Sequence, residues 1–138
     1  MQIREVMTPS VVVLPPEAEL GEIARKMRDE DIGSVPIAEN DRLVGMVTDR
    51  DIVVRGLTDG ADVSTLRARS IMSPHILYCR EDQTVEEVLE NMADQQIRRL
   101  PVVDRDKRLV GMVSLGDLSR AKARKAGDAL KDISQPGH

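Results

Sequence analysis

The sequence predicts an α/β protein that contains two copies of one β-α-β-β-α unit. The first observation is a repeated block: residues 43–51 read LVGMVTDRD, and residues 109–117 read LVGMVSLGD. The second is that the tripeptide Met-Thr-Pro at residues 7–9 returns as Met-Ser-Pro at residues 72–74. These matches lie 65 or 66 residues apart, so the repeat covers nearly the whole chain.

The first copy begins with a short strand and a helix. Residues 11–14 are apolar, mostly β-branched and bracketed by prolines, which favours a strand. Residues 17–30 form an amphipathic helix, because their apolar positions fall on one stripe that faces the core. Two strands (34–38 and 42–47) around a turn at 39–41 and a second helix (49–57) complete the unit. The stripe consists of Leu20, Ile23, Ala24 and Met27.

The second copy repeats this order after a linker rich in Gly and Asp at residues 58–63. A short helix at 65–71 can lead into it. Thr84 and Glu87 can close a capping box at the start of a helix over 84–95. Residues 104–107 are expected in a hairpin turn and 115–126 in the last helix. The cations at its end (Arg120, Lys122, Arg124 and Lys125) suit a solvated helix terminus, with contact to a partner or a phosphate as the alternative.

Each repeated block ends in a hydroxyl followed three residues later by a carboxylate, and this pair has two interpretations. The pairs are Thr48 with Asp51 and Ser114 with Asp117. Such a pair can cap a helix by satisfying the free N–H groups of its first turn. The same helix start can also offer N–H donors to a phosphate, and its acid can accept hydrogen bonds from a ribose diol.

The residue inventory argues against an enzyme and against a metal centre. The chain has one cysteine and two histidines, one of which is the C-terminal His138. It therefore offers no His or Cys nucleophile paired with a general base and no set of metal ligands. The sequence also contains no glycine-rich phosphate loop. Cys79 lies beside Tyr78 in an expected strand and has no partner for a disulfide. We expect it to be a small buried side chain and not a reactive thiol.

Composition narrows the class of protein further. Apolar content of 41% with 32% charged residues is typical of a globular protein, and no apolar run approaches the ~20 residues of a membrane span. The N-terminus carries an acid and leads into no apolar segment, so we expect no signal peptide and a cytoplasmic location. A net charge of −4 and the lack of Phe and Trp argue against a nucleic-acid partner. A half of ~60 residues buries too little surface to be more than marginally stable alone, so we expect the two halves to pack together.

The doubled order of motifs resembles a pair of CBS domains, the Bateman module, over residues 1 to about 122. These motifs are Met-Thr/Ser-Pro, a strand, a helix, hydrophobic-Pro-hydrophobic and Gly-h-h-Thr/Ser-x-x-Asp. Three segments resemble those of small stand-alone bacterial CBS-pair proteins of the hypoxic-response type: DIG at 31–33, TDRDIV at 48–53 and IRRLPV at 97–102.

The resemblance implies a fold, a partner and a function. It implies CBS repeats at residues 1–62 and 63–126, packed sheet to sheet with pseudo-twofold symmetry, a C-terminal tail at 127–138, and a homodimer formed through helices. It also implies a regulatory module that binds an adenine nucleotide (AMP, ADP or ATP) or another adenosyl ligand in clefts between the repeats, with no covalent cofactor and an unknown effector protein. The alternative is a dimeric scaffold that binds no nucleotide.

By the same resemblance, each cleft combines residues of both repeats. Arg98 and Arg99 are expected to meet phosphates, whereas Gly33 and Ser34 bring no charge, so the clefts should be unequal. The first cleft comprises Thr48, Asp51, Ile76, Leu77, Arg98, Arg99 and Pro101; the second comprises Ser114, Asp117, Val11, Val12, Gly33, Ser34 and Pro36. The alternative for the two arginines is that they are surface cations paired with nearby acids.

Overall fold

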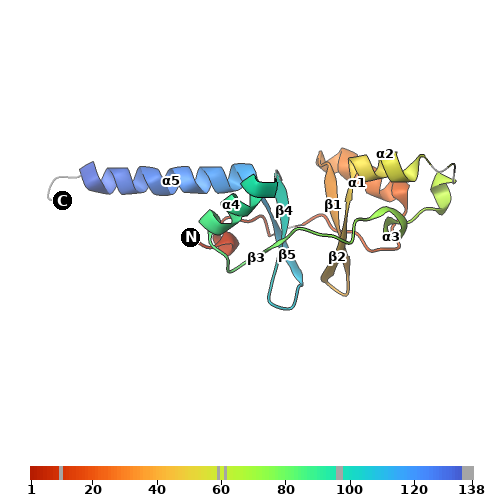
Figure 1. Cartoon of the computed structure of the whole chain (residues 1–138), viewed down its shortest axis with the longest axis horizontal. Helices are drawn as coiled ribbons and strands as arrows, with labels where there is room; N and C mark the ends of the chain where they lie inside the picture. Colours follow the sequence, from red (N-terminus) through yellow and green to blue (C-terminus); the bar gives the residue numbers. More distant parts are fainter. Residues whose placement is uncertain (10, 59, 61, 96–97, 135–138) are drawn as a thin grey trace. The chain divides into compact units, whose positions relative to one another are not determined.

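The computed structural model confirms the α/β class, with helices beside two small sheets (Figure 1). It describes residues 1–9, 11–58, 60, 62–95 and 98–134, without the side chains of residue 95 and of residues 128–134. The elements are η1 (Ile3–Glu5), α1 (Leu20–Glu30), β1 (Ser34–Glu39), β2 (Arg42–Thr48), α2 (Asp49–Gly56), η2 (Val63–Thr65), α3 (Ala68–Ile71), β3 (Cys79–Arg80), α4 (Val85–Gln95), β4 (Arg99–Val103), β5 (Leu109–Ser114) and α5 (Leu115–Ser134).

The chain divides into two compact units whose boundaries differ from the repeat boundaries. The first-repeat unit comprises Val11–Leu77 and Arg105–Leu109; the second-repeat unit comprises Met1–Ser10, Tyr78–Asp104 and Val110–His138. The first ten residues thus pack with the second repeat. The repeat boundaries at 62/63 and 126/127 stay a prediction about the sequence. Ile97, the first residue of the IRRLPV segment, and residues 135–138 lie outside the described residues.

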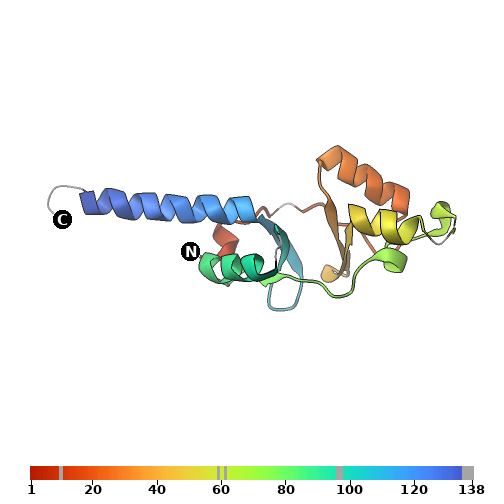
Figure 2. The same ribbon diagram turned by 45° about the horizontal axis from the view of Figure 1, so that its top comes forward.

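In the first-repeat unit, an antiparallel hairpin of β1 and β2 carries α1 and α2 side by side (Figure 2). Asn40 and Asp41 form its turn with positive φ angles of 53° and 66°, which short polar side chains tolerate best. The predicted helical stripe is confirmed at Leu20, Ile23 and Met27, which are buried in the core of this unit, whereas Ala24, which was expected on the same stripe, is exposed. Residues 105–109 complete the unit, because the Leu43 amide donates to the Lys107 carbonyl at 3.1 Å.

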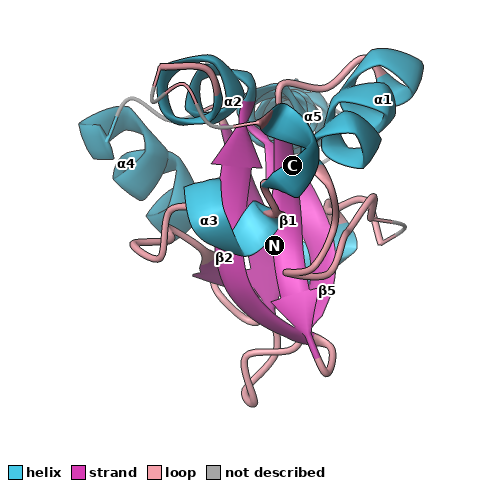
Figure 3. Ribbon diagram, turned by 90° about the vertical axis from the view of Figure 1, so that its right-hand side faces the viewer, coloured by secondary structure: helices cyan, strands magenta, loops and turns pink. Residues whose placement is uncertain are grey.

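The second-repeat unit contains a sheet in the order β3-β4-β5 with α4 beside α5. Figure 3 distinguishes its helices (cyan) from its strands (magenta). Strand β3 runs parallel to β4, whereas the first-repeat counterpart of this pairing is a single bridge from Leu14 to Ile37. The predicted strand at 11–14 is therefore reduced to one bridged residue. The core of the second-repeat unit includes Ile3, Cys79, Val85, Val88, Met92, Leu100, Val102, Val113 and Leu118.

The Met-Thr/Ser-Pro segments are exchanged between the repeats. Thr8, from the first repeat, exchanges two backbone hydrogen bonds with Met112 of β5, at 2.8 and 3.0 Å. Ser73, from the second repeat, does the same with Met46 of β2, at 2.9 and 3.3 Å. Each Gly-Met-Val strand is thus paired with the leading segment of the other repeat, which explains why the first ten residues belong to the second-repeat unit.

Three predicted boundaries differ from the structure. Helix α1 begins at Leu20 and not at residue 17, because the preceding segment bonds to the region of α3: Pro16 and Ala18 accept backbone bonds from Arg69 and Ala68 at 2.9 and 2.8 Å. The short helix predicted at 65–71 is split into η2 and α3. Helix α5 continues past Ala126 to Ser134, so most of the predicted tail is helical. In the described part of the chain, no helix combines the length and the apolar character needed to cross a membrane.

Candidate functional site

The Thr48–Asp51 pair forms a reciprocal cap at the start of α2. The Asp51 amide donates to Thr48 Oγ1 at 3.0 Å, and the Thr48 amide donates to Asp51 Oδ2 at 2.9 Å. The capping interpretation of this pair is therefore confirmed. Asp51 is half-buried, and its second oxygen, Oδ1, makes no hydrogen bond within the described residues.

The other N–H groups at the start of α2 are already used. The Asp49 amide donates to the Gly33 carbonyl at 3.0 Å, and the Arg50 amide donates to Asp49 Oδ1 at 2.8 Å. A phosphate therefore finds no spare donor among the first three amides of this helix. Within the hydroxyl–acid pair of α2, the second carboxylate oxygen of Asp51 is left available to a ligand among the described residues.

The Ser114–Asp117 pair forms the same cap on α5 but differs in its second oxygen. The Asp117 amide donates to Ser114 Oγ at 3.0 Å, and the Ser114 amide donates to Asp117 Oδ2 at 3.1 Å. Here Oδ1 accepts a 2.7 Å hydrogen bond from Arg120 Nη2, in an ion pair one helical turn along. The residue equivalent to Arg120 in α2 is Val54. The two motifs therefore present their acids differently. Asp51 keeps one oxygen without a hydrogen bond among the described residues, whereas both oxygens of Asp117 are bonded, one of them to Arg120.

Within the first-repeat unit, several predicted site residues lie near the start of α2. Ser34 is the strand partner of Thr48 at the end of the hairpin, beside Gly33. Pro36 is buried two residues further along β1, and its carbonyl accepts from the Leu14 amide at 3.2 Å. Of the remaining predicted residues of this unit, Val11 and Val12 precede the bridged residue Leu14 and are half-buried. Ile76 and Leu77 precede β3 in the sequence, and Ile76 is half-buried whereas Leu77 is exposed.

Within the second-repeat unit, the predicted arginines lie at the start of β4, next to the start of α5. The Arg98 carbonyl accepts a 2.7 Å hydrogen bond from the Leu115 amide, as Gly33 does from Asp49 in the other unit. The Arg98 side chain is exposed, that of Arg99 is half-buried and Pro101 is buried. Neither guanidinium forms an ion pair with a described residue. The alternative that these arginines are paired with nearby acids is thus not supported in the described part of the chain.

The structure therefore brings the predicted residues together in two sets, one in each unit. Thr48, Asp51 and Ser34 form one set, and Ser114, Asp117 and Arg98 form the other. The predicted combination of residues from both repeats in each cleft stays a prediction.

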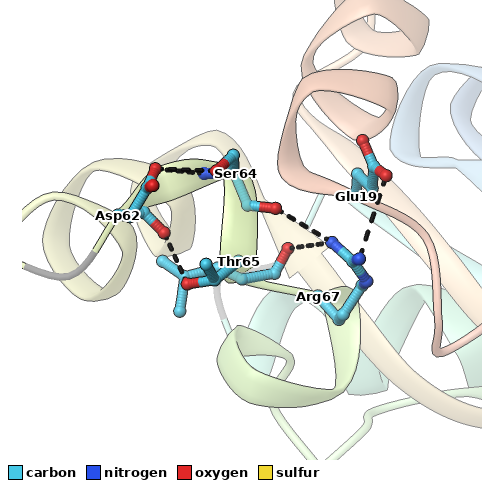
Figure 4. Close-up of polar contacts among 6 residues, drawn as sticks. Glu19, Asp62, Ser64, Thr65 and Arg67 are labelled. Carbon is cyan, nitrogen blue, oxygen red and sulfur yellow. Dashed lines mark hydrogen bonds and ion pairs between the residues drawn. The ribbon is translucent and has the colours of Figure 1, made fainter.

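The linker before α3 is held by its own polar contacts (Figure 4). The Asp62 carboxylate accepts from the Ser64 hydroxyl at 2.8 Å and from the Ser64 amide at 3.0 Å, and these bonds lower the pKa of Asp62 below its usual value. Arg67 donates to the Ser64 carbonyl at 3.2 Å and lies 3.9 Å from Glu19, the residue at the start of α1. These contacts tie the linker to α1 and complete its turn, so they indicate a structural role.

The single cysteine is buried, and the acidic residues form no cluster of potential metal ligands in the described part of the chain. Cys79 is 2% exposed, and burial raises the pKa of its thiol to about 12, which confirms the expectation of a buried side chain. No three side chains of His, Cys, Asp or Glu lie together as a potential metal site among the described residues.

Comparisons with known proteins agree on one family. The model of the CBS domain matches residues 3–56 and 68–124. Hypoxic response protein 1 of Mycobacterium tuberculosis is 39% identical over 118 residues, which are 85% of this chain and 82% of that protein.

Solved structures show the same fold. A crystal structure of Hypoxic Response Protein I with two coordinated zinc ions matches with a TM-score of 0.78 at 38% identity, covering 88% of this chain and 98% of that one. The CBS domain pair of protein MJ0100, in complex with 5'-methylthioadenosine and S-adenosyl-L-methionine, matches with a TM-score of 0.74 at 25% identity, covering 91% and 98%.

Proposed function

Because this chain belongs to the CBS domain family, we propose that it is a regulatory module that binds an adenine nucleotide or a related adenosyl ligand. The observation that carries the proposal is the second carboxylate oxygen of Asp51, which the helix cap leaves uncommitted among the described residues. The bound adenosyl compounds of the MJ0100 pair support the ligand class.

The geometry at α2 gives the acid a role toward the sugar of the ligand. Asp51 Oδ2 is fixed by the Thr48 amide, so the side chain is held in place before any ligand arrives. Its Oδ1 can then accept hydrogen bonds from a ribose diol without breaking the cap, as the acid of dinucleotide-binding folds does. Preorganisation of this kind lowers the entropic cost of binding.

The phosphates of the ligand need cations from elsewhere, since the first amides of α2 are already bonded. We assign this role to Arg98 and Arg99, which the resemblance indicates and which pair with no described acid. Guanidinium groups bind phosphate through two parallel N–H donors, which suits this task.

A second candidate function is a scaffold that binds no nucleotide and acts through protein–protein contacts. One observation favours it: Asp51 and Asp117 both serve as helix caps, which is a sufficient structural reason for each of them. In either function the protein acts as a homodimer in the cytoplasm on an effector protein, and no catalytic step is part of the proposal.

Thermal unfolding with adenosyl ligands separates the two functions. AMP, ADP, ATP, 5'-methylthioadenosine and S-adenosylmethionine are each added to the full chain. A ligand at about 100 times its dissociation constant adds ~2.7 kcal/mol to the free energy of unfolding. For a chain of this size that corresponds to a rise of roughly 5–11 °C in the melting temperature.

Asp51→Asn is the decisive variant, because its amide oxygen can keep the cap while its charge is lost. Hydrogen bonds to charged groups are worth about 1 kcal/mol more than neutral ones, so the ligand should bind roughly fivefold more weakly. Glu87→Gln is the matched control, because Glu87 belongs to the cap on α4. A full ligand-induced shift in Asp51→Asn would show that Asp51 is only a cap, and no shift with any ligand in the wild type would favour the scaffold.

A further inference from the structure

The acid at the start of α5 carries a contact that its counterpart on α2 lacks. The cap holds Asp117 Oδ2 through the Ser114 amide, and Arg120 Nη2 donates to Oδ1 at 2.7 Å. The Asp117 side chain is 26% exposed, whereas that of Arg120 is 71% exposed. Asp117 is therefore fixed by the cap, while the guanidinium of Arg120 lies at the surface and can swing away.

Gly116 provides the room in which this guanidinium lies. A Cβ atom at residue 116 would lie 3.2 Å from Arg120 Nη1, so a side chain there would crowd the guanidinium. The first repeat has Arg50 at the position of Gly116 and Val54 at the position of Arg120. The first repeat therefore lacks both the space and the cation, and Asp51 Oδ1 makes no hydrogen bond among the described residues.

The ribose of an adenosyl ligand and Arg120 compete for the same carboxylate oxygen. A carboxylate oxygen has two acceptor positions, and Arg120 takes one of the two on Asp117 Oδ1. The ion pair also offsets the charge of the acid, and hydrogen bonds to a charged acceptor are the stronger ones. A diol that leaves the cap intact must therefore displace the guanidinium or form weaker hydrogen bonds. At Asp51, no described side chain competes in this way.

We propose that Arg120 is a built-in competitor for the ribose of the ligand and makes the second-repeat acid the weaker of the two ribose-binding acids. This inference rests on the proposed function and deepens it, since it names a residue that sets the difference in affinity between the two motifs. The competition acts on the sugar and is separate from the effect of Arg98 and Arg99, which concerns the phosphates. Ligands without a phosphate should therefore also distinguish the two motifs.

The probe is 5'-methylthioadenosine, because it carries the ribose diol but no phosphate. Methyl NMR of the full chain follows the two motifs separately, since Met46 and Met112 each lie two residues before the hydroxyl of a cap. Arg120→Met keeps the length of the side chain and removes its donors. This variant should bind the probe roughly twofold to fivefold more tightly at the second motif, which is the range that exposed ion pairs contribute. The affinity at the first motif should stay unchanged.

Arg124→Met is the matched control for the lost charge. Arg124 is exposed one turn further along α5, and it forms no ion pair with a described residue. Its replacement should leave the affinity for the probe unchanged at both motifs.

Salt gives a readout that a purely structural role of Arg120 would not move. Raising NaCl from about 0.02 M to about 0.5 M screens the exposed ion pair. The second motif of the wild type should then bind the probe more tightly. Arg120→Met has no ion pair to screen, so its affinity should not respond in this way.

Transfer of the pair to the first repeat tests the inference in the opposite direction. The double variant Arg50→Gly/Val54→Arg should place a guanidinium on Asp51 Oδ1 and weaken binding at the first motif by roughly twofold to fivefold. Arg50→Gly alone is the control, and it should bind the probe as the wild type does.

The outcomes separate the inference from the proposed function. An unchanged affinity at the altered motif, in Arg120→Met or in the transferred pair, would overturn the inference and leave the adenosyl-binding function standing. Binding of AMP without any binding of 5'-methylthioadenosine would also overturn it, because the acids would then not recognise the diol. If neither compound bound to any variant, the proposed function would fall, and the inference with it.

Discussion

A methyl group at the glycine of each Gly-Met-Val strand should destabilise the protein, and by different amounts at the two sites. A Cβ atom at Gly111 would lie 2.7 Å from Met7 Sδ and 2.9 Å from the Thr8 carbonyl oxygen. A Cβ atom at Gly45 would lie 2.5 Å from Met72 Sδ, and its three nearest atoms would all belong to that side chain. The Met72 side chain can move aside, whereas the Thr8 carbonyl is held by its backbone bond to Met112.

The size of each loss in unfolding free energy depends on two opposing contributions. Overpacking of this kind costs typically 1–3 kcal/mol, and replacing Gly by Ala recovers about 0.4–1 kcal/mol by restricting the unfolded chain. We expect Gly111→Ala to lose about 1–2 kcal/mol of unfolding free energy and Gly45→Ala less than 1 kcal/mol. At roughly 2–4 °C per kcal/mol for this chain length, Gly111→Ala should melt several degrees below wild type.

Urea unfolding of double variants tests the reasoning behind these values. Met72→Ala should remove most of the cost of Gly45→Ala, because the three nearest atoms at Gly45 all come from that side chain. Met7→Ala should relieve Gly111→Ala only in part, because the Thr8 oxygen remains. Gly127→Ala, whose added Cβ meets nothing within 4 Å, is the control and should stabilise α5 slightly. The close packing would be refuted if Gly111→Ala were as stable as the wild type. It would also be refuted if the effects of the two substitutions were additive in both double variants.

Other predictions follow from single sites. Cys79 should resist maleimide at neutral pH in the folded state and react only on unfolding. The pKa of its thiol is about 12 in the folded state, above the unfolded value of 9.0, so its contribution to the free energy of unfolding is full below pH 9 and falls as the pH rises toward 12. Isothermal titration should show two unequal ligand sites, with Arg99→Ala weakening the tighter one tenfold to a hundredfold and Ser34→Ala changing little; equal sites would contradict this. Thr84→Ala should cost about 1 kcal/mol by removing the hydroxyl that accepts from the Glu87 amide at 3.2 Å, measured by urea unfolding.

Local patterns predicted most of the secondary structure. The apolar stripe through Leu20, Ile23 and Met27 and the hydroxyl–acid pairs at Thr48 and Ser114 are short-range signals, and each of them is found in the structure. The Thr84 cap was predicted as well, although its acid contacts the Thr84 hydroxyl and not the backbone amide. These features depend on neighbours within one or two helical turns, which a sequence pattern records directly.

Contacts between distant residues were not predictable in the same way. The bonds from Thr8 to Met112 and from Ser73 to Met46 join segments of different repeats, and no local pattern distinguishes them from pairing within a repeat. A signal was nevertheless present, because Met7 and Met72 match each other as Gly45 and Gly111 do. The uncommitted oxygen of Asp51 and the ion pair of Asp117 with Arg120 depend on side-chain geometry, although Val54 in place of an arginine could have suggested the difference.

The exchange of leading segments reverses the order of assembly at the N-terminus. During synthesis, residues 1–10 leave the ribosome before the second repeat does, yet Ile3 is fully buried in a core whose other buried members run from Cys79 to Leu118. The contiguous stretch 11–77 can begin to collapse earlier and awaits only residues 105–109. Residues 1–10 are therefore made long before the residues on which they pack, and until then the nascent chain carries Ile3, Val6 and Met7 as unprotected apolar side chains.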